Sequence, residues 1–222
     1  MFTTIILISN RVFAQPDLPD DYTPPRSFID LSELEGDLHG FVLNGEASFD
    51  YSGQAVGSGD INGDGFEDII IGAYEADPNG SSSGKTYVIF GKSSGFSSSV
   101  ELSGLNGTSG FSLNGEASSD QSGFAVSSGD INGDGYDDVI LGAIGADPNG
   151  SNSGKTYIYF GKSIGFSSSV ELSGLNGTSG FSLNGEASFD YSGQAVGSGD
   201  INGDGYDDVI LGAIGADPNG SN

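Results

Sequence analysis

The chain has 222 residues, with 31 acidic side chains against 6 basic ones and a formal net charge of −25. Such a surface repels nucleic acids and anionic membranes, because each phosphate contact requires a lysine or an arginine. The chain contains no cysteine and one histidine, which excludes disulfides and repeated metal sites built on thiolate or imidazole ligands.

The N-terminal residues 1–14 read MFTTIILISNRVFA and contain a short apolar run. Their Val-Phe-Ala end resembles a signal-peptidase site, so we expect a signal peptide here and a secreted or cell-surface protein. An unprocessed apolar N-terminus and a misplaced start are the alternatives. An acidic, proline-containing linker is expected at 15–28. No stretch approaches the roughly 18 apolar residues that a transmembrane helix requires.

The rest of the chain is an internal repeat of 70 residues. Residues 41–110 and 111–180 align without a gap and differ at 15 positions. A third copy begins at 181 and runs to 222, and Ile29–Ser32 matches Val100–Ser103 as part of a degenerate leading copy. We therefore divide the chain into a first repeat with a leading outer strand (29–110), a second repeat (111–180) and a truncated third repeat (181–222).

Each repeat is predicted to form four short strands. In repeat 1 these are the small-residue segment 52–58, the β-branched run 68–73 and the aromatic segment 85–91, followed by a fourth strand at either 100–102 or 111–113. Clusters of Gly, Pro and Asn separate the strands, and no segment has helical periodicity with caps. The sequence thus predicts an all-β fold, a partial β-propeller of four-stranded antiparallel blades with an incomplete ring. A β-solenoid is the alternative.

A motif rich in oxygen donors lies between the first two strands of each repeat and reads D-x-N-x-D-G-x-x-D. Side-chain oxygens at positions 1, 3, 5 and 9, with the carbonyl of position 7, can converge on one hard cation, and Gly at position 6 permits the sharp turn. All-oxygen ligation favours calcium over magnesium and transition metals. We expect about one Ca²⁺ per repeat, bound by Asp60, Asn62, Asp64, Phe66 and Asp68 in repeat 1, Asp130, Asn132, Asp134, Tyr136 and Asp138 in repeat 2, and Asp200, Asn202, Asp204, Tyr206 and Asp208 in repeat 3.

The motif begins like an EF-hand loop but does not continue as one. An EF-hand places a carboxylate at position 12, where this chain has Ile71 and its leucine equivalents, and the residues that follow read as strand. The acidic side chains at position 8, which are Glu67, Asp137 and Asp207, are expected to face solvent.

The order of these elements resembles the FG-GAP repeat. A strand is followed by this loop, then by an apolar strand ending in Gly-Ala and by an aromatic strand ending in Phe-Gly. That family forms the N-terminal β-propeller of integrin α subunits and occurs in bacterial surface proteins. The resemblance covers 29–222 and implies that the calcium loops are mainly structural. The chain departs from the family pattern at Ser52-Gly53, where Phe-Gly is usual, and at Tyr74, where Pro follows Gly-Ala.

The resemblance implies a calcium-binding extracellular module for adhesion or protein binding. We expect no enzymatic activity, because the residues offer no nucleophile–base pair and every close carboxylate pair already has a metal role. A lectin-like propeller that binds glycans through Tyr51, Tyr74 and Tyr191, or the non-catalytic propeller of a larger secreted hydrolase, is the alternative. The expected partners are an extracellular protein or glycan and further blades, supplied by a longer chain or an oligomer.

Overall fold

The structure is a computed structural model that describes residues 4–8 and 40–217, and its regular elements are nearly all strands. The linker expected at 15–28 and the outer strand expected at Ile29–Ser32 lie outside the described residues. The strands are β1 (Thr4–Ile8), β2 (Gly40–Asn44), β3 (Ala55–Gly59), β4 (Asp68–Ala73), β5 (Lys85–Ile89), β6 (Ser99–Glu101), β7 (Gly110–Asn114), β8 (Ser122–Gly129), β9 (Asp138–Ala143), β10 (Lys155–Tyr159), β11 (Ser169–Glu171), β12 (Gly180–Asn184), β13 (Ser192–Gly199) and β14 (Asp208–Ala213).

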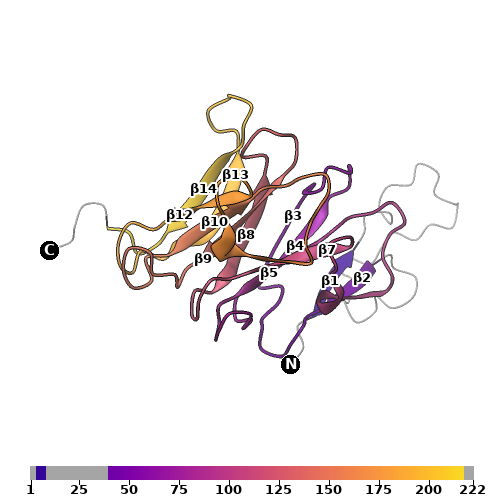
Figure 1. The fold of residues 1–222 in the computed structure, drawn as a ribbon, viewed down its shortest axis with the longest axis horizontal. Helices are drawn as coiled ribbons and strands as arrows, with labels where there is room; N and C mark the ends of the chain where they lie inside the picture. The colour runs from indigo at the N-terminus through magenta and orange to yellow at the C-terminus, as the bar shows by residue number, and fades with distance from the viewer. Residues whose placement is uncertain (1–3, 9–39, 218–222) are drawn as a thin grey trace, which may run out of the picture.

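The repeats form four-stranded antiparallel blades that stack side by side (Figure 1). The first blade has the order β7-β5-β4-β3 and the second has β12-β10-β9-β8, so the start of the following repeat supplies the fourth strand of each blade. Repeat 3 contributes the two-stranded sheet β13-β14, and a three-stranded sheet β1-β2-β6 lies beside the first blade. The prediction of an all-β, propeller-like fold is confirmed, and none of the sheets in the described part of the chain closes into a ring.

The two candidates for the fourth strand are both strands, with different roles. β7 pairs antiparallel with β5 and completes the blade, in the register Lys85↔Asn114 to Ile89↔Gly110. The three-residue strands β6 and β11 pair in parallel with β2 and β7, at the outer edge of the preceding blade. Each is followed at once by a 3-10 turn, Leu102–Gly104 or Leu172–Gly174, which limits its length.

The hydrophobic core lies in the seams between blades. One cluster joins Ile70, Val88 and Phe111 of the first blade to Leu141 and Tyr157 of the second blade. Because β9 is covered on both faces, all six of its residues are buried. In the corresponding strand β14 of repeat 3, Ile210 and Leu211 are exposed.

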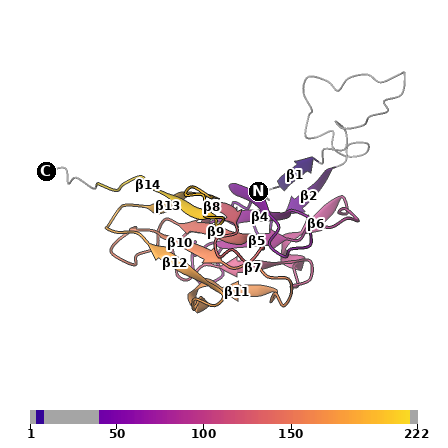
Figure 2. The ribbon, with the colours of Figure 1, turned by 90° about the horizontal axis from the view of Figure 1, so that it is seen from above.

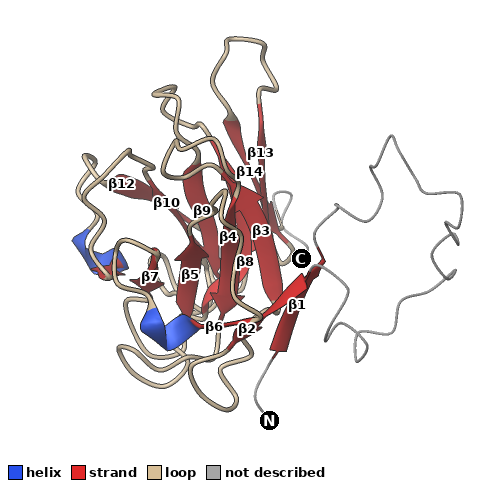
Figure 3. Ribbon diagram, turned by 90° about the vertical axis from the view of Figure 1, so that its right-hand side faces the viewer, coloured by secondary structure: helices blue, strands red, loops and turns tan. Residues whose placement is uncertain are grey.

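The innermost strands β3, β8 and β13, which are labelled in Figure 3, are rich in Gly, Ala and Ser. Such small residues let adjacent blades approach closely. A Cβ placed on Gly57 would meet Val126 of the next blade at 3.7 Å. The Ser128 hydroxyl donates to the carbonyl oxygen of Ser58 at 2.6 Å, and the Ser198 hydroxyl donates to the carbonyl oxygen of Ser128. We call this repeated link the serine ladder.

Strand β1 lies inside the segment predicted to be a signal peptide. It pairs antiparallel with β2, from Thr4↔Asn44 to Ile8↔Gly40. Since β2 corresponds to β7 at a spacing of 70 residues, β1 occupies on β2 the register that β5 occupies on β7. Within the described residues, no helix is long and apolar enough to cross a membrane.

Candidate metal centre

The first D-x-N-x-D-G-x-x-D loop turns its side-chain oxygens toward its own backbone. The two carboxylate oxygens of Asp60 accept from the amides of Asp64 and Gly65, at 3.0 and 2.9 Å. Asn62 Oδ1 also accepts from the Asp64 amide at 2.9 Å, and Asp64 Oδ1 accepts from the Phe66 amide at 2.9 Å. The other two loops repeat these bonds at their equivalent residues. The sequence therefore forms a loop whose oxygens at positions 1, 3 and 5 face inward.

Asp68, at position 9, has a different environment from the other acidic residues of the loop. Its side chain is fully buried, and Oδ2 accepts from the amides of Ile61 and Asn62 at 3.0 and 3.3 Å. Its Oδ1 accepts from the Gly91 amide at 2.8 Å, two residues beyond the end of β5. Asp68 thus ties the loop to the third strand of its own blade, and Asp138 makes the same link to Gly161 at 2.9 Å.

Burial controls the protonation of these two carboxyl groups. Loss of solvation raises the pKa of Asp68 to about 7, against the opposing effect of the three amide donors. Burial likewise raises the pKa of Asp138 to about 7, with the nearby Asp134 carboxylate adding to the shift. In the absence of a cation, both side chains therefore titrate near neutral pH.

The position-8 residues differ from one repeat to the next, which corrects the expectation that all three face solvent. Glu67 is exposed, but Asp137 is half-buried, and its Oδ2 accepts from the Asp60 amide of the preceding loop at 2.9 Å. The Asp137 amide in turn donates to the Asp60 carbonyl at 3.1 Å. Burial, with Glu67, Asp207 and Asp60 nearby, raises the pKa of Asp137. This contact joins two repeats, so the pattern within one repeat could not reveal it.

The loops of repeats 1 and 2 are also covered by the repeat that follows them. Ile61, at position 2, is fully buried in the seam, and its carbonyl accepts from the Lys162 amide at 3.1 Å. The Tyr136 ring lies so close to Gly63 that it leaves no room for a Cβ at that position. In loop 3 the equivalent Ile201 is 71% exposed, and no heavy atom lies within 4 Å of a Cβ placed on Gly203.

Comparison with known proteins agrees with this architecture. The family model of the FG-GAP repeat matches residues 52–89, 122–159 and 192–222, and each match contains one of the three loops. The chain contains three FG-GAP repeats. Their matched segments begin at or near the first strand of each blade, and the first two end at the third strand.

Integrin α subunits are among the curated proteins that the chain resembles. It is 31% identical over 182 residues to mouse integrin alpha-IIb, over 78% of this chain and 16% of that protein. It is 34% identical over 164 residues to human integrin alpha-6, over 71% of this chain and 13% of that protein. For chicken integrin alpha-8 the figures are 31% over 207 residues, with 86% and 17% coverage. The chain thus spans about one sixth of the length of these relatives.

The donor set of each FG-GAP loop fits a calcium ion. Each inward oxygen of Asp60 and Asn62 accepts one amide hydrogen and keeps a second lone pair, and Asp64 keeps one carboxylate oxygen without a loop amide. Such oxygens are the ligands that hard cations prefer. Asp68 fits less directly, because three amides already use its carboxylate. Across residues 4–8 and 40–217, no three acidic or histidine side chains gather as a ready metal cluster.

Aromatic side chains gather around the start of the first strands and the end of β4. Tyr51 is 48% exposed and stacks on Tyr74 with ring centroids 5.7 Å apart, and Tyr74 contacts the edge of Phe124 in repeat 2 at 5.4 Å. Phe49 is also exposed and, like Tyr51, has a positive φ angle, which is uncommon for a bulky residue. Tyr191 is half-buried in repeat 3. Phe49 and Tyr51 therefore lie at the surface, whereas Tyr74 and Tyr191 are half-buried.

Proposed function

We propose that the chain is a calcium-stabilised, non-catalytic binding module that acts outside the cell, in adhesion or protein binding. The observation that carries the proposal is the threefold loop in which oxygens at positions 1, 3 and 5 face inward, within FG-GAP repeats similar to those of integrin α subunits. In this proposal Asp60, Asn62, Asp64 and the Phe66 carbonyl bind the ion, and Asp68 exchanges one amide contact for the metal. The same roles apply in repeats 2 and 3.

Calcium would supply a positive charge to a loop in which several carboxylates repel one another. The protein's own contribution is to hold the oxygens in place through the loop amides, so that little ordering is required on binding. Extracellular calcium modules can work with dissociation constants of about 10⁻⁴ to 10⁻³ M. The role of the ion is structural, because the loop connects the first two strands of each blade.

The test is thermal unfolding of the full chain with calcium, with magnesium and with chelator, at matched ionic strength. We expect calcium to raise the melting temperature, with a stabilisation of about 2.7 kcal/mol for each site at a hundredfold excess over its dissociation constant. Asp134→Asn should weaken this response, because it removes the charge of a ligand at position 5. Glu67→Gln, which removes one charge from an exposed position-8 residue, is the matched control and should leave the response unchanged. A melting temperature indifferent to calcium would refute the proposal.

Exposed aromatic rings favour a second candidate, a glycan-binding surface. The stacked Tyr51–Tyr74 pair offers an aromatic platform, and the nearby Glu75 accepts from Gln121 Nε2 at 3.2 Å and from the Ser82 hydroxyl at 2.5 Å. A glycan array probed with the calcium-loaded chain tests this function. Binding that is lost in Tyr51→Ala and kept in Phe189→Ala would assign it to this platform, whereas an array without signal would leave only the protein-binding function.

A further inference from the structure

The dipeptide Asn-Gly recurs through the repeats and is prone to one side reaction. Glycine has no side chain to hinder its amide nitrogen, which can attack the side-chain carbonyl carbon of the preceding asparagine. The contacts of each pair decide whether that attack is open to it. In the described residues the pairs begin at Asn44, Asn62, Asn79, Asn106, Asn114, Asn132, Asn149, Asn176, Asn184 and Asn202.

Most of these pairs are held by hydrogen bonds that oppose the attack. A bonded glycine amide must lose its acceptor before it can react, and a bonded asparagine Nδ2 holds the side chain and its leaving group in place. The glycine amide is bonded after Asn106, Asn114, Asn176, Asn184 and Asn202. The side-chain Nδ2 is bonded in Asn44, Asn79, Asn114, Asn149 and Asn202.

Asn62 and Asn132, at position 3 of the first two loops, carry neither restraint. Within residues 40–217, the amides of Gly63 and Gly133 and the Nδ2 atoms of both asparagines have no acceptor. Asn62 Oδ1 accepts from the Asp64 amide at 2.9 Å, and this bond folds the side chain over the peptide group that joins Asn62 to Gly63. The bond therefore brings the reacting carbonyl carbon toward the glycine nitrogen and polarises it.

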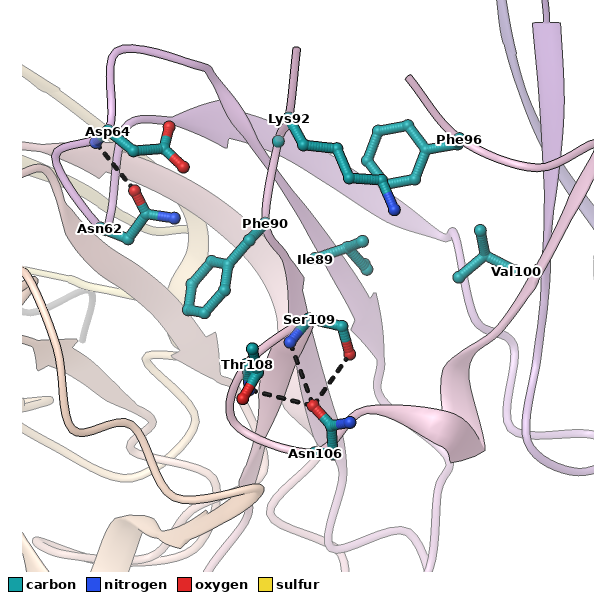
Figure 4. A pocket seen from close by; sticks show the side chains of 11 residues that line it. Asn62, Asp64, Ile89, Phe90, Lys92, Phe96, Val100, Asn106, Thr108 and Ser109 are labelled. Carbon is teal, nitrogen blue, oxygen red and sulfur yellow. Dashed lines mark hydrogen bonds between the residues drawn. The ribbon is translucent and has the colours of Figure 1, made fainter. Parts of the chain in front are cut away.

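Asn106 offers a matched comparison in the same part of the molecule. Asn62 and Asn106 line one cavity of about 440 Å³, and in both the side-chain oxygen accepts from the amide two residues further on (Figure 4). The difference lies in the next residue. The Gly107 amide donates to the Gly110 carbonyl at 2.8 Å, whereas the Gly63 amide has no acceptor in the described part of the chain.

The packing of the blades requires glycine at this position of the loop. Adjacent blades lie side by side (Figure 2), and the Tyr136 and Tyr206 rings of the following repeats lie against Gly63 and Gly133. Both glycines also have positive φ angles, 69° and 73°, which residues with a side chain rarely adopt. A bulkier residue that would slow the attack is therefore excluded here.

We propose that Asn62 and Asn132 are sites of spontaneous deamidation. The Gly63 nitrogen forms a bond to Cγ of Asn62, the bond between Cγ and Nδ2 breaks, and ammonia leaves with the proton that the glycine amide gives up. Water then opens the cyclic imide at one of its two carbonyl carbons and yields aspartate or isoaspartate. The same steps apply to Asn132 and Gly133, and neither an oxidant nor a reductant is required.

The reaction adds a carboxylate to a loop that already contains Asp60, Asp64 and Asp68. Aspartate at position 3 keeps the spacing of the oxygen donors and raises their charge, which strengthens calcium binding. Isoaspartate inserts one more backbone atom between positions 3 and 4, which disturbs that spacing and weakens binding. This consequence rests on the proposed function, whereas the reaction itself does not.

Peptide mapping of the full chain tests the modification. The folded chain is incubated in chelator at mildly alkaline pH and digested with pepsin in acid, and mass spectrometry detects the replacement of an amide by an acid. We expect conversion at Asn62 and Asn132 to be about fivefold or more faster than at Asn106 and Asn176, because the latter glycine amides are bonded.

The same chain unfolded in guanidinium chloride is the control. Its Asn-Gly pairs should all react at similar rates, because the hydrogen bonds of the fold are lost. Equal rates in the folded chain, conversion at Asn106 ahead of Asn62, or an absence of conversion at Asn62 and Asn132 would each overturn the proposal.

Thermal unfolding of Asn62→Asp in calcium tests the consequence for the metal site. We expect calcium to raise its melting temperature more than that of the unchanged chain. If the asparagines convert but neither melting temperature responds to calcium, the proposed function fails and the modification stands. If calcium stabilises the chain but Asn62 and Asn132 stay intact, the modification fails and the proposed function stands.

Discussion

The first and third loops have the same motif but different surroundings. Ile61 is fully buried and Ile201 is exposed. The Asp68 carboxylate holds the amide at the end of β5, whereas Asp208 Oδ1 accepts from the side chain of Asn202 at 3.3 Å. The amides inside the two loops nevertheless bond to the same side-chain oxygens. The motif therefore sets the turn, and the rest of the blade and the next repeat decide how firmly it is held.

Removal of the position-9 carboxylate should give the largest difference in the free energy of unfolding between the first and third loops. Asp68→Ala leaves three backbone amides without an acceptor in a buried site, and we expect it to lower the free energy of unfolding by about 4 kcal/mol. Asp208→Ala affects a half-exposed side chain and should cost about 1 kcal/mol. Urea unfolding in chelator, at dilution, gives both values. Equal losses would mean that the surroundings of the loop do not matter.

The pH dependence of stability should reflect the buried loops. Without metal, the folded pKa of about 7 for Asp68 and Asp138 lies above the unfolded value, so the folded state binds more protons between pH 4 and pH 7. Stability is then highest in acid and falls as the pH rises, by about 2 kcal/mol for each carboxyl between pH 5 and pH 7.

Chemical denaturation in chelator at several pH values measures this slope. The double variant Asp68→Asn and Asp138→Asn should remove most of it, and saturating calcium should flatten it, because a bound cation favours the ionised carboxylate. A metal-free chain that becomes more stable from pH 5 to pH 7 would contradict the assignment.

Loss of the contact between consecutive loops should have the smallest effect on the free energy of unfolding. Asp137→Ala removes the acceptor of the Asp60 amide and should cost about 1 kcal/mol, because that bond is half-buried. Glu67→Ala, at the same position of repeat 1, should change the free energy of unfolding by less than about 0.5 kcal/mol. Differential scanning calorimetry of the two variants makes the comparison. If Glu67→Ala were the more harmful change, the link through Asp137 would not be stabilising.

The sequence predicted the strands well where residue type and burial agree. The run 68–73 is β4 with the same bounds, and 85–91 contains β5, because β-branched and aromatic residues there fill a seam. The first strand was predicted less accurately, at 52–58 against Ala55–Gly59, because small residues carry little strand preference and the register shifts at its equivalent, between Ser122 and Val126. The fourth strand remained ambiguous because two short candidates serve two adjacent sheets.

The site was predictable in its local part only. The spacing of Asp60, Asn62 and Asp64 is enough to anticipate an inward-facing loop, since the bonds that their side chains accept all lie within five residues. The Gly91 amide, which donates to the Asp68 carboxylate, lies 23 residues further along the chain. The contact between Asp60 and Asp137 spans 77 residues. Such partners depend on how strands and blades pack, and only the three-dimensional arrangement reveals them. Whether the loop residues bind calcium stays a prediction.

The serine ladder on the innermost strands bears on how such a chain can lengthen. Each rung uses a hydroxyl from one repeat and a main-chain carbonyl from the repeat before it, so a carbonyl is always present for the next hydroxyl. A tandem duplication of the coding sequence, in whole units of 70 residues, would therefore bring its own rung and need no matching change elsewhere. The near identity of the first two units is what recent growth by this route would leave behind.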